Sequence, residues 1–135
     1  MIKRLKWEEK FSVGVPAMDQ EHRRIIGMIN KLQDEFACVH KAETVAELLT
    51  EMTQYAQDHF QHEERMLAAH NYPRMLEQHA QHVGYRKKNV ALCQATRLDI
   101  TGLYKFLRNW WAHHILEEDM RYKAFFAGMT AKEKL

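Results

Sequence analysis

The fold of this chain is decided by residues 44–70, TVAELLTEMTQYAQDHFQHEERMLAAH. Apolar side chains recur there at steps of three or four, through Val45, Leu48, Met52, Tyr55 and Met66. Such steps keep side chains on one face of an α-helix. His59 and Glu63 fill the gap in this stripe, where core side chains are expected. Because a core rarely accepts such groups without a compensating charge, the stretch predicts a buried helix that carries metal ligands.

Two further stripes carry histidines in the same way. They run through Met18, His22, Ile25, Ile29, Leu32 and Phe36, and through Ile100, Leu103, Leu107, Trp110 and His114. Asp119 lies five residues after His114, about 500° of helix, which on an ideal helix would turn it roughly 140° away. We therefore expect the helix to end or deform between these two residues. Together with His82, the polar side chains predict a two-metal centre inside a helical bundle.

The composition suits long helices in one domain. The 135 residues are 46% hydrophobic, with only five Gly and two Pro. The 20 basic and 18 acidic residues leave a net charge of +2 without a basic block, so no nucleic-acid partner is expected. No apolar run approaches the roughly 20 residues of a membrane span, and residues 1–11 lack the apolar stretch of a signal peptide. We therefore expect a cytoplasmic protein without a membrane partner.

The predicted fold is all-α, an up-down-up-down four-helix bundle formed by a single domain over residues 1–135. An extended N-terminal arm over residues 1–17 precedes bundle helices at about 19–40, 43–70, 73–95 and 99–118. Asp19 is the expected cap of the first helix, and the break at Pro73 follows the second. A short C-terminal helix over residues 121–127 is expected to end at Gly128.

Three motifs, in the same order along nearly the whole chain, resemble those of the bacterial hemerythrins. They are Trp7 with Phe11-Ser-Val-Gly14 and Asp19-Gln-Glu-His22, then His59-Phe60-x-x-Glu63-Glu64 with Tyr72-Pro73, then Trp110-x-x-x-His114-Ile115-x-x-x-Asp119 with Tyr122. The resemblance implies a hemerythrin-like domain with a non-haem di-iron site. It also implies reversible dioxygen binding, for oxygen storage, delivery or sensing. In this family, carboxylates and an oxo or hydroxo group bridge the two iron ions.

Carried over residue by residue, the resemblance implies six metal ligands in this chain. One iron would be held by His22 and His59, the other by His82 and His114, and the bridges would be Glu63 and Asp119. Three apolar residues lie within four positions of a proposed ligand and are candidates to line an oxygen pocket, namely Ile25, Phe60 and Ile115. We interpret Glu64 as a surface charge.

One position departs from the family pattern. Between the second and the last of these motifs the family has a further one, normally His-x-x-x-His, whose first histidine falls on Gln78 and whose second is His82. Either Gln78 takes the place of this ligand, or a local helix distortion lets the neighbouring His79 do so. The stripe of Met75, Gln78, His82 and Tyr85 favours a Gln78 that faces the metals.

Three classes of function remain open at this point. The first is reversible dioxygen binding, with dioxygen at an open position on the iron held by His22 and His59. The second is a di-iron enzyme with peroxidase- or oxidase-like activity, in which the histidine missing at Gln78 opens a second position. The third is a helical adaptor without metal, which leaves the polar groups in three core stripes unexplained. We favour the first class and keep the enzyme as the alternative.

Overall fold

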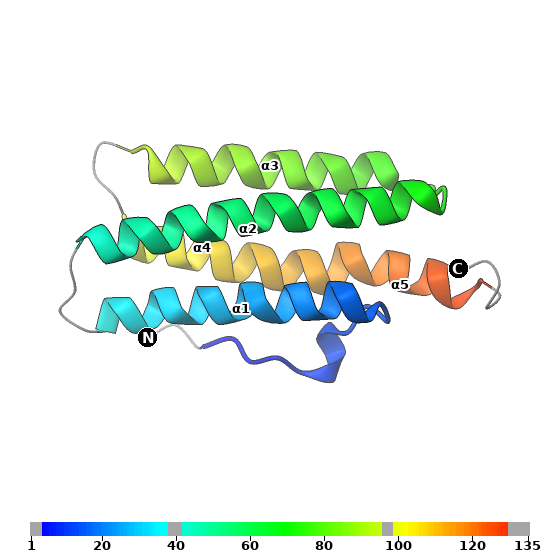
Figure 1. The fold of residues 1–135 in the computed structure, drawn as a ribbon, viewed down its shortest axis with the longest axis horizontal. Coiled ribbons are helices and arrows are strands. Elements are labelled where there is room, and N and C mark those ends of the chain that lie inside the picture. Colours follow the sequence, from blue (N-terminus) through cyan, green and yellow to red (C-terminus); the bar gives the residue numbers. More distant parts are fainter. Residues whose placement is uncertain (1–3, 38–41, 96–98, 130–135) are drawn as a thin grey trace.

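The chain folds into a bundle of four long helices (Figure 1). The computed structural model describes residues 4–37, 42–95 and 99–129. The long helices are α1 (Pro16–Ala37), α2 (Ala42–Ala69), α3 (Met75–Cys93) and α4 (Ile100–His113), and the short segments are η1 (Glu9–Phe11), η2 (His114–Asp119) and α5 (Met120–Ala127). No strand occurs within these described ranges. The predicted all-α four-helix bundle with a short C-terminal helix is therefore confirmed.

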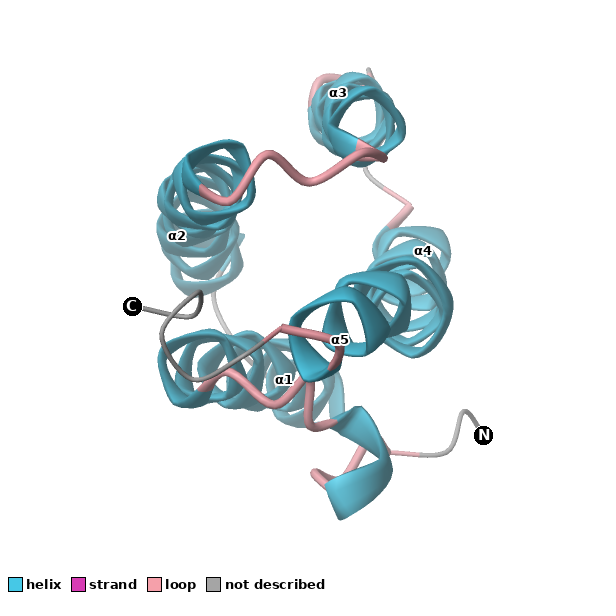
Figure 2. Ribbon diagram, turned by 90° about the vertical axis from the view of Figure 1, so that its right-hand side faces the viewer, coloured by secondary structure: helices cyan, strands magenta, loops and turns pink. Residues whose placement is uncertain are grey.

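The helices form a ring when the bundle is viewed along its length (Figure 2). α1 packs against α2 and α4, and α3 packs against the same two helices from the other side. Successive long helices run in opposite directions, and α5 continues the line of α4 (Figure 1). Side chains from all four long helices therefore share one interior.

The turn between α2 and α3 is set by Asn71 and Pro73. Asn71 has a positive φ of 55°, a left-handed conformation that asparagine tolerates better than most residues. The N–H groups of Asn71 and Tyr72 donate to carbonyls of the last turn of α2, at 3.1 and 3.0 Å. These bonds satisfy acceptors that the end of a helix leaves open. α3 then begins at Met75, two residues later than the sequence suggested.

The first helix begins at Pro16, earlier than the expected start near Asp19. Proline suits the first turn of a helix, because its fixed φ is helical and it has no N–H to satisfy. Asp19 lies within the first turn and is not the cap that we expected. Its carboxylate accepts hydrogen bonds from the Ser12 hydroxyl at 2.6 Å and from the Val13 N–H at 2.8 Å. Asp19 therefore fastens the N-terminal arm to α1.

The N-terminal arm follows the outside of the bundle next to α1 (Figure 1). The Asn30 amide donates to the Leu5 carbonyl at 2.7 Å. The Arg23 guanidinium lies over the Trp7 ring, 4.7 Å from its centroid, and that ring contacts Phe11 at 5.8 Å. Aromatic and polar contacts therefore hold the arm in place where it lacks regular hydrogen bonding.

The core is formed largely by the faces that the apolar stripes predicted, although Tyr55, Met66 and Ile100 of these stripes are only partly buried. Ile25, Ile29 and Leu32 of α1 are fully buried, as is Leu103 of α4. On α4 the fully buried tryptophan is Trp111, whereas Trp110, which we placed in the stripe, is only partly buried. Phe36 lies outside the residues whose side chains are described. Across the described ranges, no helix has both the length and the apolar character needed to cross a bilayer.

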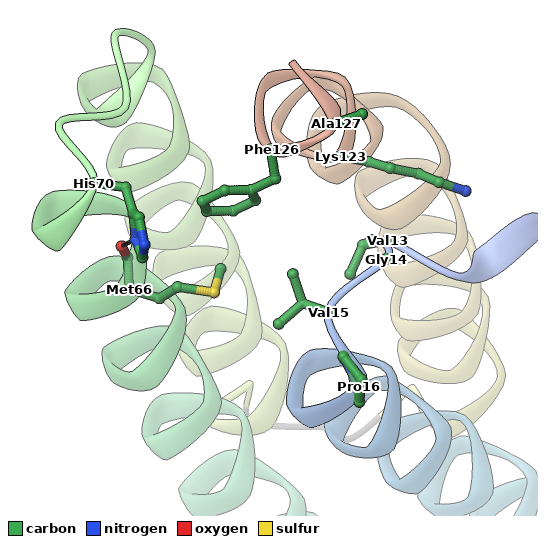
Figure 3. A pocket seen from close by; sticks show the side chains of 9 residues that line it. All are labelled: Val13, Gly14, Val15, Pro16, Met66, His70, Lys123, Phe126 and Ala127. Atoms are coloured by element: carbon green, nitrogen blue, oxygen red, sulfur yellow. Dashed lines mark hydrogen bonds between the residues drawn. The ribbon is translucent and has the colours of Figure 1, made fainter. Parts of the chain in front are cut away.

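An apolar hollow of about 420 Å³ lies at one end of the bundle (Figure 3). Val15 of the arm, Met66 of α2 and Phe126 of α5 point into it (Figure 3). Gly14, with a φ of 75°, forms the turn of the arm beside this hollow. None of the described residues that line the hollow is one of the metal ligands predicted from the sequence.

Candidate metal centre

Six polar side chains converge inside the bundle. They are His22 from α1, His59 and Glu63 from α2, His82 from α3, and His114 and Asp119 from η2. Each of them is exposed to 1% or less. The structure thus brings together all six residues singled out from the sequence. Histidine and carboxylate donors that converge at this depth form a candidate metal site.

The segment η2 brings His114 and Asp119 to the same side of their helix. It is a π-helical segment, whose backbone hydrogen bonds span five residues rather than four. Residues five positions apart, which an α-helix would turn away from each other, therefore face the same way. The helix deforms between the two residues and does not end near residue 118, because the chain continues directly into α5.

The two oxygens of Glu63 face different pairs of imidazoles. Oε2 lies 3.6 Å from Nε2 of His22 and 3.5 Å from Nε2 of His59. Oε1 lies 3.0 Å from Nε2 of His82 and 3.9 Å from Nε2 of His114. The donor atoms form two groups that share Glu63, and within each group they lie within 4.8 Å of one another. A carboxylate in this position can bridge two metal ions.

Asp119 spans the same two groups. Its Oδ2 lies 3.3 Å from Nε2 of His22, and its Oδ1 lies 3.2 Å from Nε2 of His114. Two carboxylates between four imidazoles can hold two cations close together, because the negative charges offset the repulsion between the cations. Mixed imidazole and carboxylate donors suit iron better than calcium or copper.

Several atoms of the cluster have no hydrogen-bond partner among the described residues. These atoms are Nε2 of His82, Nε2 of His114, Oε1 of Glu63 and Oδ2 of Asp119. They lie near one another without the geometry of a hydrogen bond, as donor atoms do when they point at a common ion. An unpaired buried polar atom costs about 1–3 kcal/mol. The residues present therefore fit a pair of metal ions.

Gln78 faces this cluster, and His79 does not. Gln78 is 1% exposed, and its Nε2 donates to Oδ1 of Asp119 at 2.9 Å. The side chain of His79 is 52% exposed, and its Nδ1 lies 2.6 Å from Oε1 of Glu64. α3 is an unbroken α-helix over this stretch. The helix distortion that would bring His79 into the site is therefore not observed.

Two acidic residues contact Nδ1 of site histidines, and neither contact was predicted from the sequence. Oε1 of Glu21 lies 2.7 Å from Nδ1 of His59, and Oε2 of Glu64 lies 2.8 Å from Nδ1 of His82. The interpretation of Glu64 as a surface charge is therefore wrong. A partner on Nδ1 fixes the ring and leaves Nε2 free to face a metal. The available signal was position, since Glu21 and Glu64 each stand next to a proposed ligand in the sequence.

Tyr122 is a further contact of the site for which the sequence assigned no role. Its hydroxyl donates to Oε2 of Glu63 at 2.8 Å. Burial, together with the charges of Glu63 and Asp119, raises the pKa of Tyr122 well above its usual value. Tyr122 therefore stays protonated and remains a hydrogen-bond donor to the central carboxylate.

In the metal-free site, contacts between the imidazoles and the carboxylates stabilise the buried charges. Burial opposes the charge on His22 and His114, but contacts with Asp119 and Glu63 outweigh it and raise the pKa of His22 to about 9 and that of His114 to about 10. Burial lowers the pKa of His59. Burial also disfavours ionised Glu63, but the imidazoles around it hold its pKa well below its usual value. Protons and metal ions therefore compete for the same nitrogens.

The three candidates for an oxygen pocket are all buried. Ile25 and Ile115 are 0% exposed and Phe60 is 2% exposed. The Phe60 ring stacks on the His82 imidazole with centroids 4.0 Å apart, and on the Trp111 ring at 5.3 Å. Apolar surface thus lies directly beside one half of the site. That these three residues line an oxygen pocket stays a prediction.

The fold and the site together define a class of protein, the four-helix bundles in which buried carboxylates and histidines form a metal site. The sequence matches the family described as the Hemerythrin HHE cation binding domain, over residues 13–126. The chain therefore belongs to the hemerythrin family. It is a non-haem iron protein that binds dioxygen, as the resemblance in sequence implied.

Individual relatives agree with this membership. A bacteriohemerythrin of Clostridium acetobutylicum is 30% identical over 126 residues, which cover 86% of this chain and 96% of the relative. A myohemerythrin of Theromyzon tessulatum is 26% identical over 119 residues, covering 87% and 90%. A crystal structure of a mutant hemerythrin is similar in fold, with a TM-score of 0.81 at 24% identity, covering 89% of this chain and 95% of that one.

Proposed function

We propose that the protein binds two iron ions and takes up dioxygen reversibly at this pair. Four imidazoles and two carboxylates would hold the iron: one ion on His22 and His59, the other on His82 and His114, with Glu63 and Asp119 as bridges. The observation that carries the proposal is the position of Glu63, whose two oxygens face separate pairs of histidines. A site for a single ion would not need a carboxylate shared between two groups of donors.

Iron ions held by these residues would supply the reversible redox chemistry, in which electrons pass to dioxygen on binding and return to the iron on release. The chain holds the ligands in fixed orientations and keeps the site largely free of water. Glu21 and Glu64 orient His59 and His82 so that each Nε2 faces the interior. Complete burial of the site keeps bulk water away from it. Water-free surroundings favour release of intact dioxygen over side reactions that need water or protons.

Membership of the hemerythrin family does not favour the alternative of a peroxidase- or oxidase-like enzyme. Storage, delivery and sensing of oxygen are equally compatible with the site. The cytoplasmic location and the lack of a nucleic-acid partner stay predictions from the sequence.

Replacing one proposed ligand tests the site. In His59→Ala, one ion loses an imidazole ligand, and the remaining buried donors lose the charge of the metal ion that stabilises them. We therefore expect the iron content to fall by about half or more. Exposed His113, one residue before a proposed ligand, provides the control His113→Ala. Iron per folded chain, determined after iron-replete expression, is the measurement. Equal iron content in His59→Ala and His113→Ala would contradict the proposal.

A further inference from the structure

Gln78 is a buried amide at the site whose nitrogen has a hydrogen-bond partner and whose oxygen has none in the described part of the chain. Its Nε2 donates to Oδ1 of Asp119 at 2.9 Å. Its Oε1 is buried and has no hydrogen-bond partner among the described residues. Gln78 stands four residues before His82 on the unbroken helix α3, so both side chains lie on the face directed at the cluster.

The orientation of this amide follows from the charge on Asp119. In the proposed two-ion site Asp119 is an ionised carboxylate, because a ligand of a metal ion has to be deprotonated. An ionised carboxylate only accepts hydrogen bonds, so the NH₂ end of Gln78 has to face it. The amide of Gln78 lies on the His114 side of the cluster, because Oδ1 of Asp119, which accepts its hydrogen bond, lies 3.2 Å from Nε2 of His114.

We propose that Oε1 of Gln78 is a ligand of the metal ion on His82 and His114, while the N–H of the same amide fixes Asp119 as a bridge. The inference rests on the two-ion site proposed above and assigns a fifth protein donor to one half of it. A buried amide oxygen without a partner is unfavourable, and a hard cation such as Fe²⁺ accepts carbonyl oxygen as a ligand. Coordination of the metal ion therefore gives Oε1 of Gln78 the partner that it lacks among the described residues.

This assignment makes the two halves of the site unequal. The ion on His82 and His114 has two nitrogens, an oxygen from each bridging carboxylate, and the amide oxygen of Gln78. The ion on His22 and His59 has two nitrogens and the two carboxylate oxygens only. With the oxo or hydroxo bridge that the family implies, the first ion would have six donors and the second five. The open position for dioxygen therefore falls on the His22 and His59 side, and the absence of a histidine at position 78 does not open a second one.

Titration of the metal-free full-length protein with Co²⁺ tests this role, because Co²⁺ absorption reports the number and kind of its ligands. The wild type is expected to bind two ions per chain. Gln78→Leu removes the oxygen donor. The affinity for the ion on His82 and His114 is therefore expected to fall about tenfold or more, while the affinity for the other ion is unchanged. Gln81→Leu, the same change one turn further along α3, is the control and is expected to match the wild type.

Gln78→Glu separates coordination from the mere positioning of Asp119. A glutamate keeps an oxygen donor but cannot donate a hydrogen bond to an ionised carboxylate. If Oε1 is a ligand, Gln78→Glu binds both Co²⁺ ions at least as tightly as the wild type does. If Gln78 only positions Asp119, Gln78→Glu loses as much affinity as Gln78→Leu, and that result overturns the proposal. Circular dichroism of each variant establishes that it is folded.

Azide provides an independent readout of open positions. The Co²⁺-loaded wild type is expected to bind one azide per chain, and Gln78→Leu is expected to bind a second. Two azides on the wild type would overturn the proposal, because the His82 side would then already be open. Failure of the wild type to bind two Co²⁺ ions would refute the two-ion site itself. A wild type that binds two ions with the same affinity as Gln78→Leu would refute only the role of Gln78.

Discussion

Each half of the site contains one imidazole whose orientation is fixed by a carboxylate that contacts its Nδ1. Glu21 contacts His59 on one side, and Glu64 contacts His82 on the other. In both cases burial opposes ionisation of the carboxyl group, but the hydrogen bond to the buried imidazole holds its pKa below the usual value. The two carboxylates therefore stay charged near neutral pH and keep the Nδ1 protons of the ligands in place.

Removal of the carboxylate behind His82 should weaken metal binding on that side only. We expect Glu64→Ala to lower the affinity for one of two Co²⁺ ions by about tenfold, because the imidazole loses its fixed orientation. Glu64→Gln, which can still accept the hydrogen bond, should retain most of the affinity. The matched control is Glu117→Ala at an exposed position. If Glu64→Ala and Glu117→Ala bind both ions alike, the contact with His82 has no role in binding.

The residues of the site could be predicted from the sequence to different extents. His22, His59 and His114 interrupt apolar stripes, and that interruption is visible without a structure. The position of Glu64 next to Glu63 was an available signal, but its partner could not be identified, because His82 stands on another helix and only the packing of α2 against α3 brings them together. Gln78 could be placed facing the site by its spacing from His82, but its hydrogen bond to Asp119 needed the position of η2.

At the scale of elements, η2 is the segment on which the site depends most. One extra residue there would rotate Asp119 and α5 by about 100° relative to α4. We expect insertion of one Ala between Leu116 and Glu117 to abolish binding of at least one ion, because Asp119 and Tyr122 would both leave the cluster. Insertion of one Ala between Gln94 and Ala95, in the loop after α3, is the control. Iron content of the two folded insertion variants is the measurement, and equal content would contradict the role of η2.

The helices themselves were largely predictable, and their ends were not. Steps of three and four between apolar residues gave the buried faces of α1, α2 and α4. The sequence also predicted that the helix ends or deforms between His114 and Asp119, but it did not decide between the two and did not indicate the π-helical form. The start of α1 at Pro16 was missed because it depends on a tertiary contact, in which Asp19 binds Ser12 instead of capping the helix.

For the whole molecule, metal binding should be linked to the release of protons. The pKa of His22 is raised to about 9 and that of His114 to about 10 in the metal-free protein, above the ordinary value of 6.5. Both imidazoles therefore carry protons near neutral pH, and a metal ion can bind only the neutral form. We expect the release of about two protons per chain on loading, and an affinity that rises as pH increases towards about 9.

Proton release can be measured by adding Co²⁺ to metal-free protein in a weakly buffered solution near neutral pH. The double variant His22→Ala/His114→Ala is the control and should release almost none. An affinity for Co²⁺ that does not change between about pH 6 and pH 9 would show that these two imidazoles are not displaced by the metal.

Dioxygen uptake by protein loaded with Fe²⁺ under anaerobic conditions tests the central claim most directly. Bound dioxygen and iron per chain would be measured through repeated cycles of exposure to oxygen and its removal. We expect about two iron ions per chain, one dioxygen taken up for each pair, and full release with the iron retained. Loaded protein that takes up no dioxygen, or that consumes it without releasing it, would contradict reversible binding at a two-iron site.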